Sequence, residues 1–85
     1  MKEFKYIITD SVGIHARPAG LLAKEANKFT SKITIEANGK TADATRLMAV
    51  MGLGVKSGNE VVIKASGEDE VEAISRLQEF MQTNL

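Results

Sequence analysis

Apolar residues in this 85-residue chain fall into two kinds of segment, and the order of these segments constrains the fold more than any other feature. Segments that are β-rich or alternate with period two predict strands over Phe4–Ile8, Ile33–Glu36, Lys40–Asp43 and Glu60–Ala65. Helical spacing predicts helices over Ala16–Phe29, Arg46–Met51 and Asp69–Met81, with approximate C-terminal ends. The order β-α-β-β-α-β-α, with the helices packed on one face of four strands, predicts an α+β two-layer domain spanning residues 1–85.

Local signals predict where several of these segments begin and end. Asn38-Gly39 is a strong hairpin signal, because a type I′ turn needs two residues that tolerate a positive φ. Thr45 is expected to cap the second helix, and Asp69 with Glu72 fits a capping box for the last one. The expected core faces of the first and last helices are Ala19, Leu22, Ala23, Ala26 and Phe29, and Val71, Ile74, Leu77, Phe80 and Met81.

The composition excludes several classes of protein. With 44% hydrophobic and 26% charged residues the chain is typical of globular domains. The absence of cysteine excludes a disulfide framework and a thiolate metal site, and is compatible with a reducing cytoplasm. The N-terminal residues lack the apolar block of a signal peptide, and the longest apolar run is shorter than the ~18 residues of a membrane span. We therefore expect a cytoplasmic protein that does not insert into a membrane.

The net charge is zero, but the charges are unevenly distributed. Residues 1–64 hold ten Lys and Arg against six Asp and Glu, whereas residues 65–85 hold one against five. This split predicts a basic face and an acidic last helix. We expect no nucleic-acid partner, because there is no Lys/Arg cluster and only four Phe and Tyr residues are available to stack on bases.

The only histidine, His15, lies in Gly13-Ile14-His15-Ala16-Arg17-Pro18-Ala19-Gly20, where a turn is expected to open into a helix. Pro18 fits the first or second helical position, so that His15 falls at or near the N-cap. A neutral imidazole there can attack an electrophile, and the helix end and Arg17 favour the negative charge acquired. The motif therefore predicts a histidine that carries phosphate. One His without Cys makes a metal site a poor alternative, and no nucleophile-elbow motif supports a Ser-His-Asp hydrolase.

A partner-binding surface is expected beside His15. A second stripe on the first helix, together with the short second helix, supplies its residues: Ala16, Arg17, Gly20, Leu21, Lys24, Lys28, Leu47, Met48 and Met51. The second helix is apolar nearly all round, so part of it should be exposed, and methionine adapts to partners of different shape. A basic rim would attract acidic partners. It consists of Arg17, Lys24, Lys28 and Arg46.

The chain resembles the HPr family, the histidine-containing phosphocarriers of the bacterial sugar phosphotransferase system. The segment Gly13–Ala19 is similar to the active-site signature of that family, Asn38-Gly39-Lys40 to its hairpin, and Leu47–Val55 to its second helix. The resemblance covers essentially the whole chain. It implies an open-faced β-sandwich of four antiparallel strands covered on one face by three helices.

The resemblance also implies a function. His15 would take a phosphoryl group on Nδ1 from phosphoenolpyruvate-charged enzyme I and pass it to the IIA units of sugar permeases, while Arg17 would steady the phosphoryl oxygens. The chain would be a monomeric reactant in a relay and not an enzyme, with transcriptional regulators as further partners. We expect neither a cofactor nor a bound metal ion.

One position departs from the family pattern. Members from Gram-positive bacteria usually have a regulatory serine immediately before the second helix, and Arg46 occupies that position here. Arg46 cannot accept phosphate in this way, and we do not transfer the role to Thr45. Two alternatives remain open: a regulatory module of the same fold that acts by docking, and a small ligand-binding domain without phosphoryl chemistry.

Overall fold

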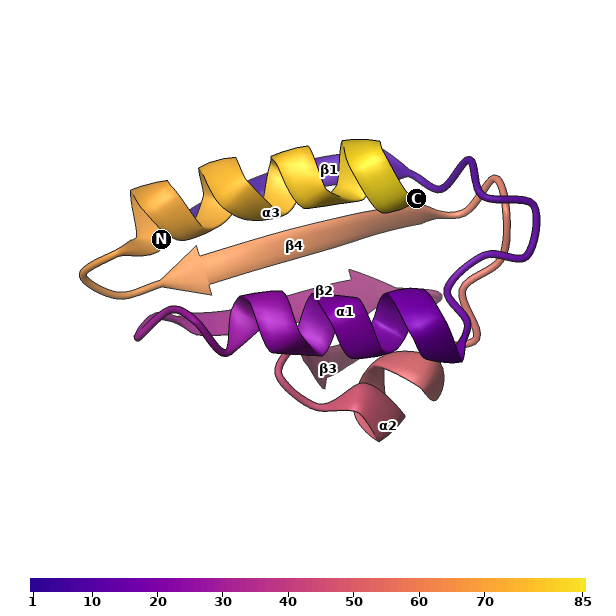
Figure 1. Cartoon of the computed structure of the whole chain (residues 1–85), viewed down its shortest axis with the longest axis horizontal. Helices are drawn as coiled ribbons and strands as arrows, with labels where there is room; N and C mark the ends of the chain where they lie inside the picture. Colours follow the sequence, from indigo (N-terminus) through magenta and orange to yellow (C-terminus); the bar gives the residue numbers. More distant parts are fainter.

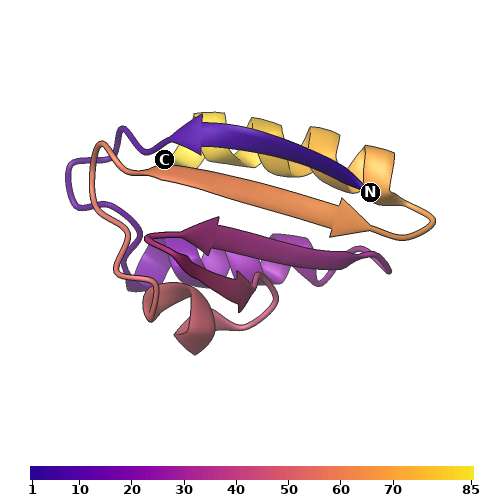
Figure 2. The same ribbon diagram turned by 180° about the vertical axis from the view of Figure 1, so that it is seen from behind.

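The computed structural model describes all 85 residues, as four strands and three helices in the predicted order. The strands are β1 (Lys2–Ile7), β2 (Lys32–Ala37), β3 (Lys40–Asp43) and β4 (Glu60–Ser66), and the helices are α1 (Ala16–Ala26), α2 (Leu47–Met51) and α3 (Glu70–Asn84). The strands form one antiparallel sheet in the order β1-β4-β2-β3. Helices α1 and α3 cover one face of this sheet and α2 packs beside α1 near β3, as the two opposite views show (Figures 1 and 2). The α+β two-layer prediction is confirmed.

The core lies between the sheet and the helices. Alternate strand residues such as Ile33, Ile35 and Ile63 are fully buried and face Leu22 of α1 and Leu77 of α3. Together with the other buried apolar side chains they form one cluster of 21 residues. No helix combines the length and the apolar character that crossing a membrane requires.

The predicted hairpin is confirmed. Asn38 and Gly39 have φ values of 53° and 76°, as a type I′ turn between β2 and β3 requires. The side chain of Asn38 also donates to the carbonyl oxygen of Leu53 at 3.0 Å, which ties the turn to the segment after α2.

The predicted end of α1 is wrong by three residues. The last α-helical hydrogen bond runs from the N–H of Asn27 to the carbonyl of Ala23, which also accepts the side-chain N–H of Asn27. The next two N–H groups, of Lys28 and Phe29, donate to carbonyls three residues back, which is the tighter geometry common at helix ends. Phe29 is therefore half-buried beside the core and not part of the face of the helix.

The core face of α3 differs from the prediction in two residues, because Ala73 belongs to it and Val71 does not. Ala73, Leu77 and Met81, spaced four apart, are fully buried, and Ile74 and Phe80 flank them half-buried. Val71 is 65% exposed, because two residues along a helix correspond to a rotation of about 200° away from Ala73. The helix also continues three residues beyond the predicted end at Met81, to Asn84.

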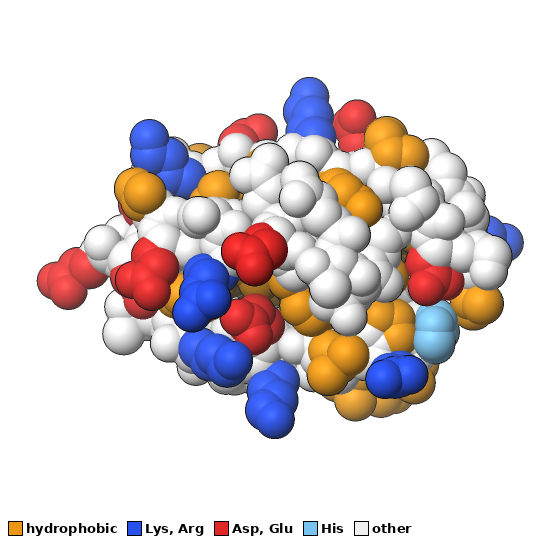
Figure 3. All heavy atoms as spheres, turned by 45° about the horizontal axis from the view of Figure 1, so that its top comes forward, with side chains coloured by type: hydrophobic (Ala, Val, Ile, Leu, Met, Phe, Trp, Pro, Cys, Tyr) orange, Lys and Arg blue, Asp and Glu red, His pale blue; other side chains and the backbone are white.

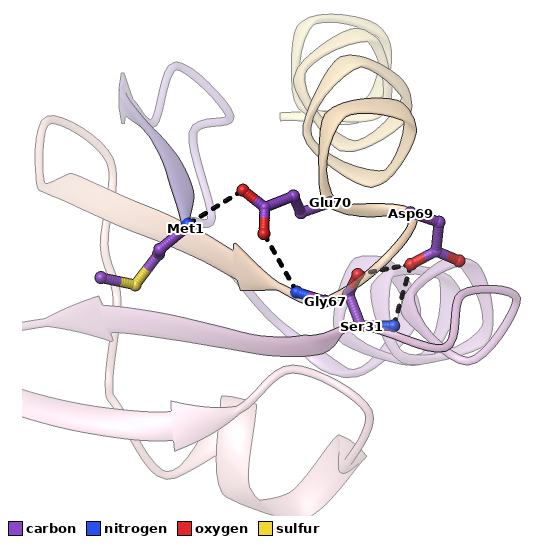
Figure 4. A network of polar contacts seen from close by, with 5 residues as sticks. All are labelled: Met1, Ser31, Gly67, Asp69 and Glu70. Atoms are coloured by element: carbon purple, nitrogen blue, oxygen red, sulfur yellow. Dashed lines mark hydrogen bonds and ion pairs between the residues drawn. The ribbon is translucent and has the colours of Figure 1, made fainter.

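Neither predicted side-chain cap is present. The N-cap of α2 is Arg46, and the hydroxyl of Thr45 donates instead to Asp43 at 2.6 Å. Asp69 is the N-cap residue of α3, but its carboxylate makes no bond to that helix and accepts hydrogen bonds from Ser31 instead (Figure 4). It also accepts the N–H of Thr30. Both predictions assumed a hydrogen bond to the first turn of the following helix, and both side chains bond outside that helix.

Gly13 lies where two segments approach closely. Its φ is +81°, and a Cβ atom there would lie 2.3 Å from the carbonyl oxygen of Val55. The adjacent N–H of Ile14 donates to that same oxygen at 3.1 Å. Only glycine allows this approach, because any side chain would force the two backbones apart.

We expect Gly13→Ala to lower the free energy of unfolding by about 3 kcal/mol or more, because it adds the clash with Val55 to the ~1–2 kcal/mol cost of a left-handed backbone. Gly54→Ala is the matched control, since Gly54 also has a positive φ but no atom within 4 Å of the added Cβ. Urea denaturation of both variants measures the difference. Equal losses in the two variants would contradict the steric argument.

Asp69 couples the stability of the fold to acid pH. The hydrogen bond from the Ser31 hydroxyl, assisted by the Thr30 and Ser31 N–H groups, lowers the pKa of Asp69 to about 2 from an ordinary value of 3.8. Because the folded pKa is the lower one, the stabilisation is present above pH 3.8 and is lost as the pH falls toward 2. Asp69→Asn should therefore make the free energy of unfolding less dependent on pH in this range. Glu68→Gln is the control, because Glu68 is exposed and has no hydrogen bond or ion pair.

Candidate functional site

His15 is the N-cap residue of α1, as predicted. Its backbone is extended, with φ −108° and ψ −173°, and its side chain is exposed and makes no hydrogen bond. No carboxylate lies within 4.0 Å of the imidazole, since the ion pairs of the molecule are all elsewhere. Both ring nitrogens are therefore uncommitted and accessible at the surface.

The loop before His15 is held by backbone hydrogen bonds to distant segments. The N–H groups of Thr9 and Asp10 donate to the backbone oxygen of Leu85 at 2.7 and 3.0 Å, and Ile14 donates to Val55. A turn within the loop closes where Gly13 donates to the carbonyl of Asp10 at 3.0 Å. The position of His15 is thus determined by the end of α3 and by the segment before β4.

The first turn of α1 offers free donors close to His15. Pro18 is the third helical residue and not the first or second, and its side chain is buried. The N–H groups of Ala16 and Arg17 precede it and have no carbonyl partner within the helix. Free N–H groups and the positive end of the helix dipole favour an anion at this point.

A surface cavity of about 240 Å³ opens beside His15. Its lining comes from the loop, the first turns of α1 and the last turn of α3: Asp10, His15, Arg17, Pro18, Leu21, Thr83 and Asn84. Figure 3 shows the histidine at one end of the molecule, between a basic and an acidic side chain. The cavity places Arg17, which has no ion pair, together with His15.

Three lining residues were not predicted from the sequence. Asp10, Thr83 and Asn84 carry no motif, and two of them are about 70 residues from His15 along the chain. Thr83 and Asn84 reach the cavity because α1 and α3 run in opposite directions, which brings the start of one helix beside the end of the other (Figure 1). Asp10 reaches it from the loop before α1. No local signal in the sequence marks them.

The predicted partner surface is exposed. Leu21 of α1 is 39% exposed, and Leu47, Met48 and Met51 of α2 are 38%, 76% and 36% exposed. We call these four residues the apolar patch. Gly20 lies between the two helices, where an added Cβ would be 4.0 Å from Leu47. By contrast Val50, on the opposite side of α2, is fully buried.

The predicted basic rim is present with one qualification. Arg17, Lys24 and Arg46 are exposed and form no ion pair, whereas Lys28 pairs with Glu25 at 3.0 Å. Three of the four cations are thus free to attract an acidic partner. No group of three His, Asp or Glu side chains is arranged to hold a metal ion.

Comparisons with known proteins show which family the chain belongs to. The family profile described as the PTS HPr component phosphorylation site matches residues 2–83. The chain belongs to the HPr family. The phosphocarrier protein HPr of Mycoplasma capricolum is 49% identical over 81 residues, which cover 95% of this chain and 91% of that protein. HPr proteins are phosphocarriers of the phosphotransferase system, and membership of the family makes this chain a phosphocarrier protein of that system.

Solved structures show the same fold. The histidine-containing phosphocarrier protein of Mycoplasma has a TM-score of 0.94 with 48% identity, covering 96% of this chain and 93% of that one. The Bacillus subtilis catabolite repression protein Crh, solved as a domain-swapped dimer, has a TM-score of 0.77 with 40% identity, covering 100% and 98%.

Proposed function

We propose that His15 accepts a phosphoryl group on Nδ1 from phosphorylated enzyme I and passes it to enzyme IIA units of sugar permeases. The observation that carries the proposal is an exposed, uncommitted imidazole at the N-cap of α1 that shares a cavity with Arg17. The cavity has room for three phosphoryl oxygens, and Arg17, which carries one of the two free N–H groups of the first turn, lines it.

The transfer needs no cofactor. The lone pair of Nδ1 forms the new P–N bond while the donor atom of enzyme I regains the electron pair of its own bond to phosphorus. The proton on Nε2 stays in place, so the phosphoryl unit moves without net loss of protons or electrons. In the second transfer the acceptor on enzyme IIA attacks the same phosphorus and His15 regains its lone pair. Such in-line transfer depends on positioning and on charge stabilisation, which each partner completes.

The groups around His15 stabilise the phosphorylated state only modestly. The N-terminal end of α1 contributes about 0.3–2 kcal/mol. A charge-assisted hydrogen bond from Arg17 adds about 1.5–3 kcal/mol. A carrier must release the phosphoryl group that it accepts, and a much stronger stabilisation of the phosphorylated state would prevent the second transfer.

The apolar patch and the basic rim are the surfaces on which we expect the partners to dock. Exposed methionine and leucine side chains adapt to partners of different shape, and the free cations beside them accelerate encounter with acidic surfaces. A relay requires short-lived complexes, so we expect interfaces below ~1,200 Å². We expect the chain to meet these partners in the cytoplasm and to act there as a monomer with the patch uncovered.

Regulatory binding is a second candidate function, favoured by the similarity to Crh. Such a module would dock on transcriptional regulators without accepting phosphate. The retained His15 favours the relay. Arg46 offers no hydroxyl to a serine kinase, and the neighbouring Thr45 hydroxyl is bound to Asp43. We therefore propose that the chain lacks regulation by phosphorylation at this position.

His15→Ala should abolish phosphorylation and leave the fold intact, because the exposed imidazole makes no hydrogen bond. The measurement is incubation with phosphoenolpyruvate, Mg²⁺ and enzyme I, followed by intact mass and mapping of the modified residue. Wild type should gain one phosphoryl group and the variant none, with the free energy of unfolding changed by less than about 0.5 kcal/mol. Acid-labile labelling of the variant would place the acceptor elsewhere.

Met48→Ala should slow phosphoryl transfer from enzyme I by about 3- to 10-fold, because it removes apolar contact area from the expected interface. Its stability should not change measurably, since Met48 is 76% exposed. Val71→Ala is the matched control, because Val71 is 65% exposed but lies on α3 outside the apolar patch. If both variants transfer phosphate at the wild-type rate, the patch is not the docking surface.

A further inference from the structure

The cavity at His15 contains an acidic residue that the relay described so far does not use. Asp10 is half-buried and lines the same cavity as His15 and Arg17. Its carboxylate is the only one among the lining residues. A negative charge at this point repels the negatively charged phosphoryl group, so Asp10 must disfavour the phosphorylated state of His15.

Asp10 is held firmly in this place. Its side-chain Oδ1 accepts the N–H of Val12 at 2.9 Å, its backbone carbonyl accepts the N–H of Gly13, and its own N–H donates to Leu85. These three hydrogen bonds connect the residue to the loop before His15 and to the end of α3. The backbone of Asp10 is fixed by two of these bonds, and the third ties its carboxylate to the loop at Val12.

The charge of Asp10 is not compensated. No Lys or Arg nitrogen lies within 4.0 Å of its carboxylate, and Arg17, which lines the same cavity, is equally unpaired. The last turn of α3 closes the same cavity and presents the negative end of a helix dipole. A phosphoryl group on His15 would therefore meet favourable charge from α1 and Arg17, and unfavourable charge from Asp10 and α3.

We propose that Asp10 sets the phosphoryl-transfer potential of His15 by destabilising its phosphorylated state. The inference rests on the proposed phosphocarrier function. In the unphosphorylated protein the neutral imidazole interacts weakly with the carboxylate. Once the P–N bond forms, two or nearly two negative charges share the cavity with Asp10, and the repulsion is relieved when the phosphoryl group leaves for the next acceptor. Asp10 thus limits the stabilisation by Arg17 and drives the second transfer.

Asp10→Asn tests this with little disturbance of the loop, because the asparagine side-chain oxygen can still accept the N–H of Val12. The measurement is the equilibrium constant for phosphoryl exchange between enzyme I and the chain, from the phosphorylated fractions of both by intact mass. The variant should shift this constant toward the phosphorylated carrier by about 3- to 10-fold at low salt, and less at high salt. A damaged fold would not increase phosphorylation.

Asp43→Asn is the matched control. Asp43 also accepts the N–H of the residue two positions on, Thr45, and loses the same charge on substitution, but it does not line the cavity. Its exchange constant should equal that of wild type. Asp10→Ser removes the charge and keeps a short oxygen acceptor, so it should shift the exchange constant in the same direction. This second variant keeps the test valid if Asp10→Asn does not fold.

The outcomes separate the two proposals. If wild type gains no phosphoryl group from enzyme I, the proposed function fails. If wild type is phosphorylated and both Asp10 variants have the wild-type exchange constant, the role of Asp10 is wrong while the proposed function stands. A shift of equal size in Asp43→Asn would also overturn it, because net charge alone would then be the cause.

Discussion

The close contact between the backbones of Gly13–Ile14 and Val55 is the constraint on which the candidate site depends. It fixes the loop before α1 against the segment that leads into β4, while Leu85 accepts the N–H groups of Thr9 and Asp10. These bonds join residues that are about 40 and 75 positions apart in the sequence. The position of an exposed side chain is thus determined by buried, long-range backbone geometry, and α1 begins where this loop ends.

The antiparallel arrangement of α1 and α3 gives the cavity its mixed electrostatics. The start of α1 supplies free N–H groups, and the end of α3 lies on the other side of the same cavity. The side chains of Arg17 and Asp10 add a full positive and a full negative charge to the same cavity. A site that only binds phosphate would bind it more tightly without the negative charge. A site that must pass the phosphoryl group on is helped by having both the positive and the negative charge. The balance of charges therefore fits a carrier better than a receptor for phosphate.

Most features set by neighbouring residues were predictable from the sequence, and features set by distant contacts were not. The Asn38-Gly39 turn needs only two positive φ values, and the element order follows from local periodicity. The capping role of Asp69 was wrong because its carboxylate bonds to Ser31, which is far away in the sequence. The capping role of Thr45 was wrong for a local reason, since its hydroxyl bonds to Asp43 two residues earlier. The position of His15 followed from its motif, but the cavity wall supplied by Thr83 and Asn84 required the three-dimensional arrangement of α3.

Helix α2 shows how the chain can expose apolar surface without losing stability. Five residues are far too few to form a stable helix in isolation, so α2 depends on tertiary packing. Val50 is fully buried and Ala49 packs against the core, and these contacts anchor the helix from one side. The opposite side contributes little to stability, which leaves Leu47, Met48 and Met51 free to face a partner. Because anchoring and exposure fall on different residues of one short helix, the apolar patch can change in sequence without unfolding the domain that presents His15.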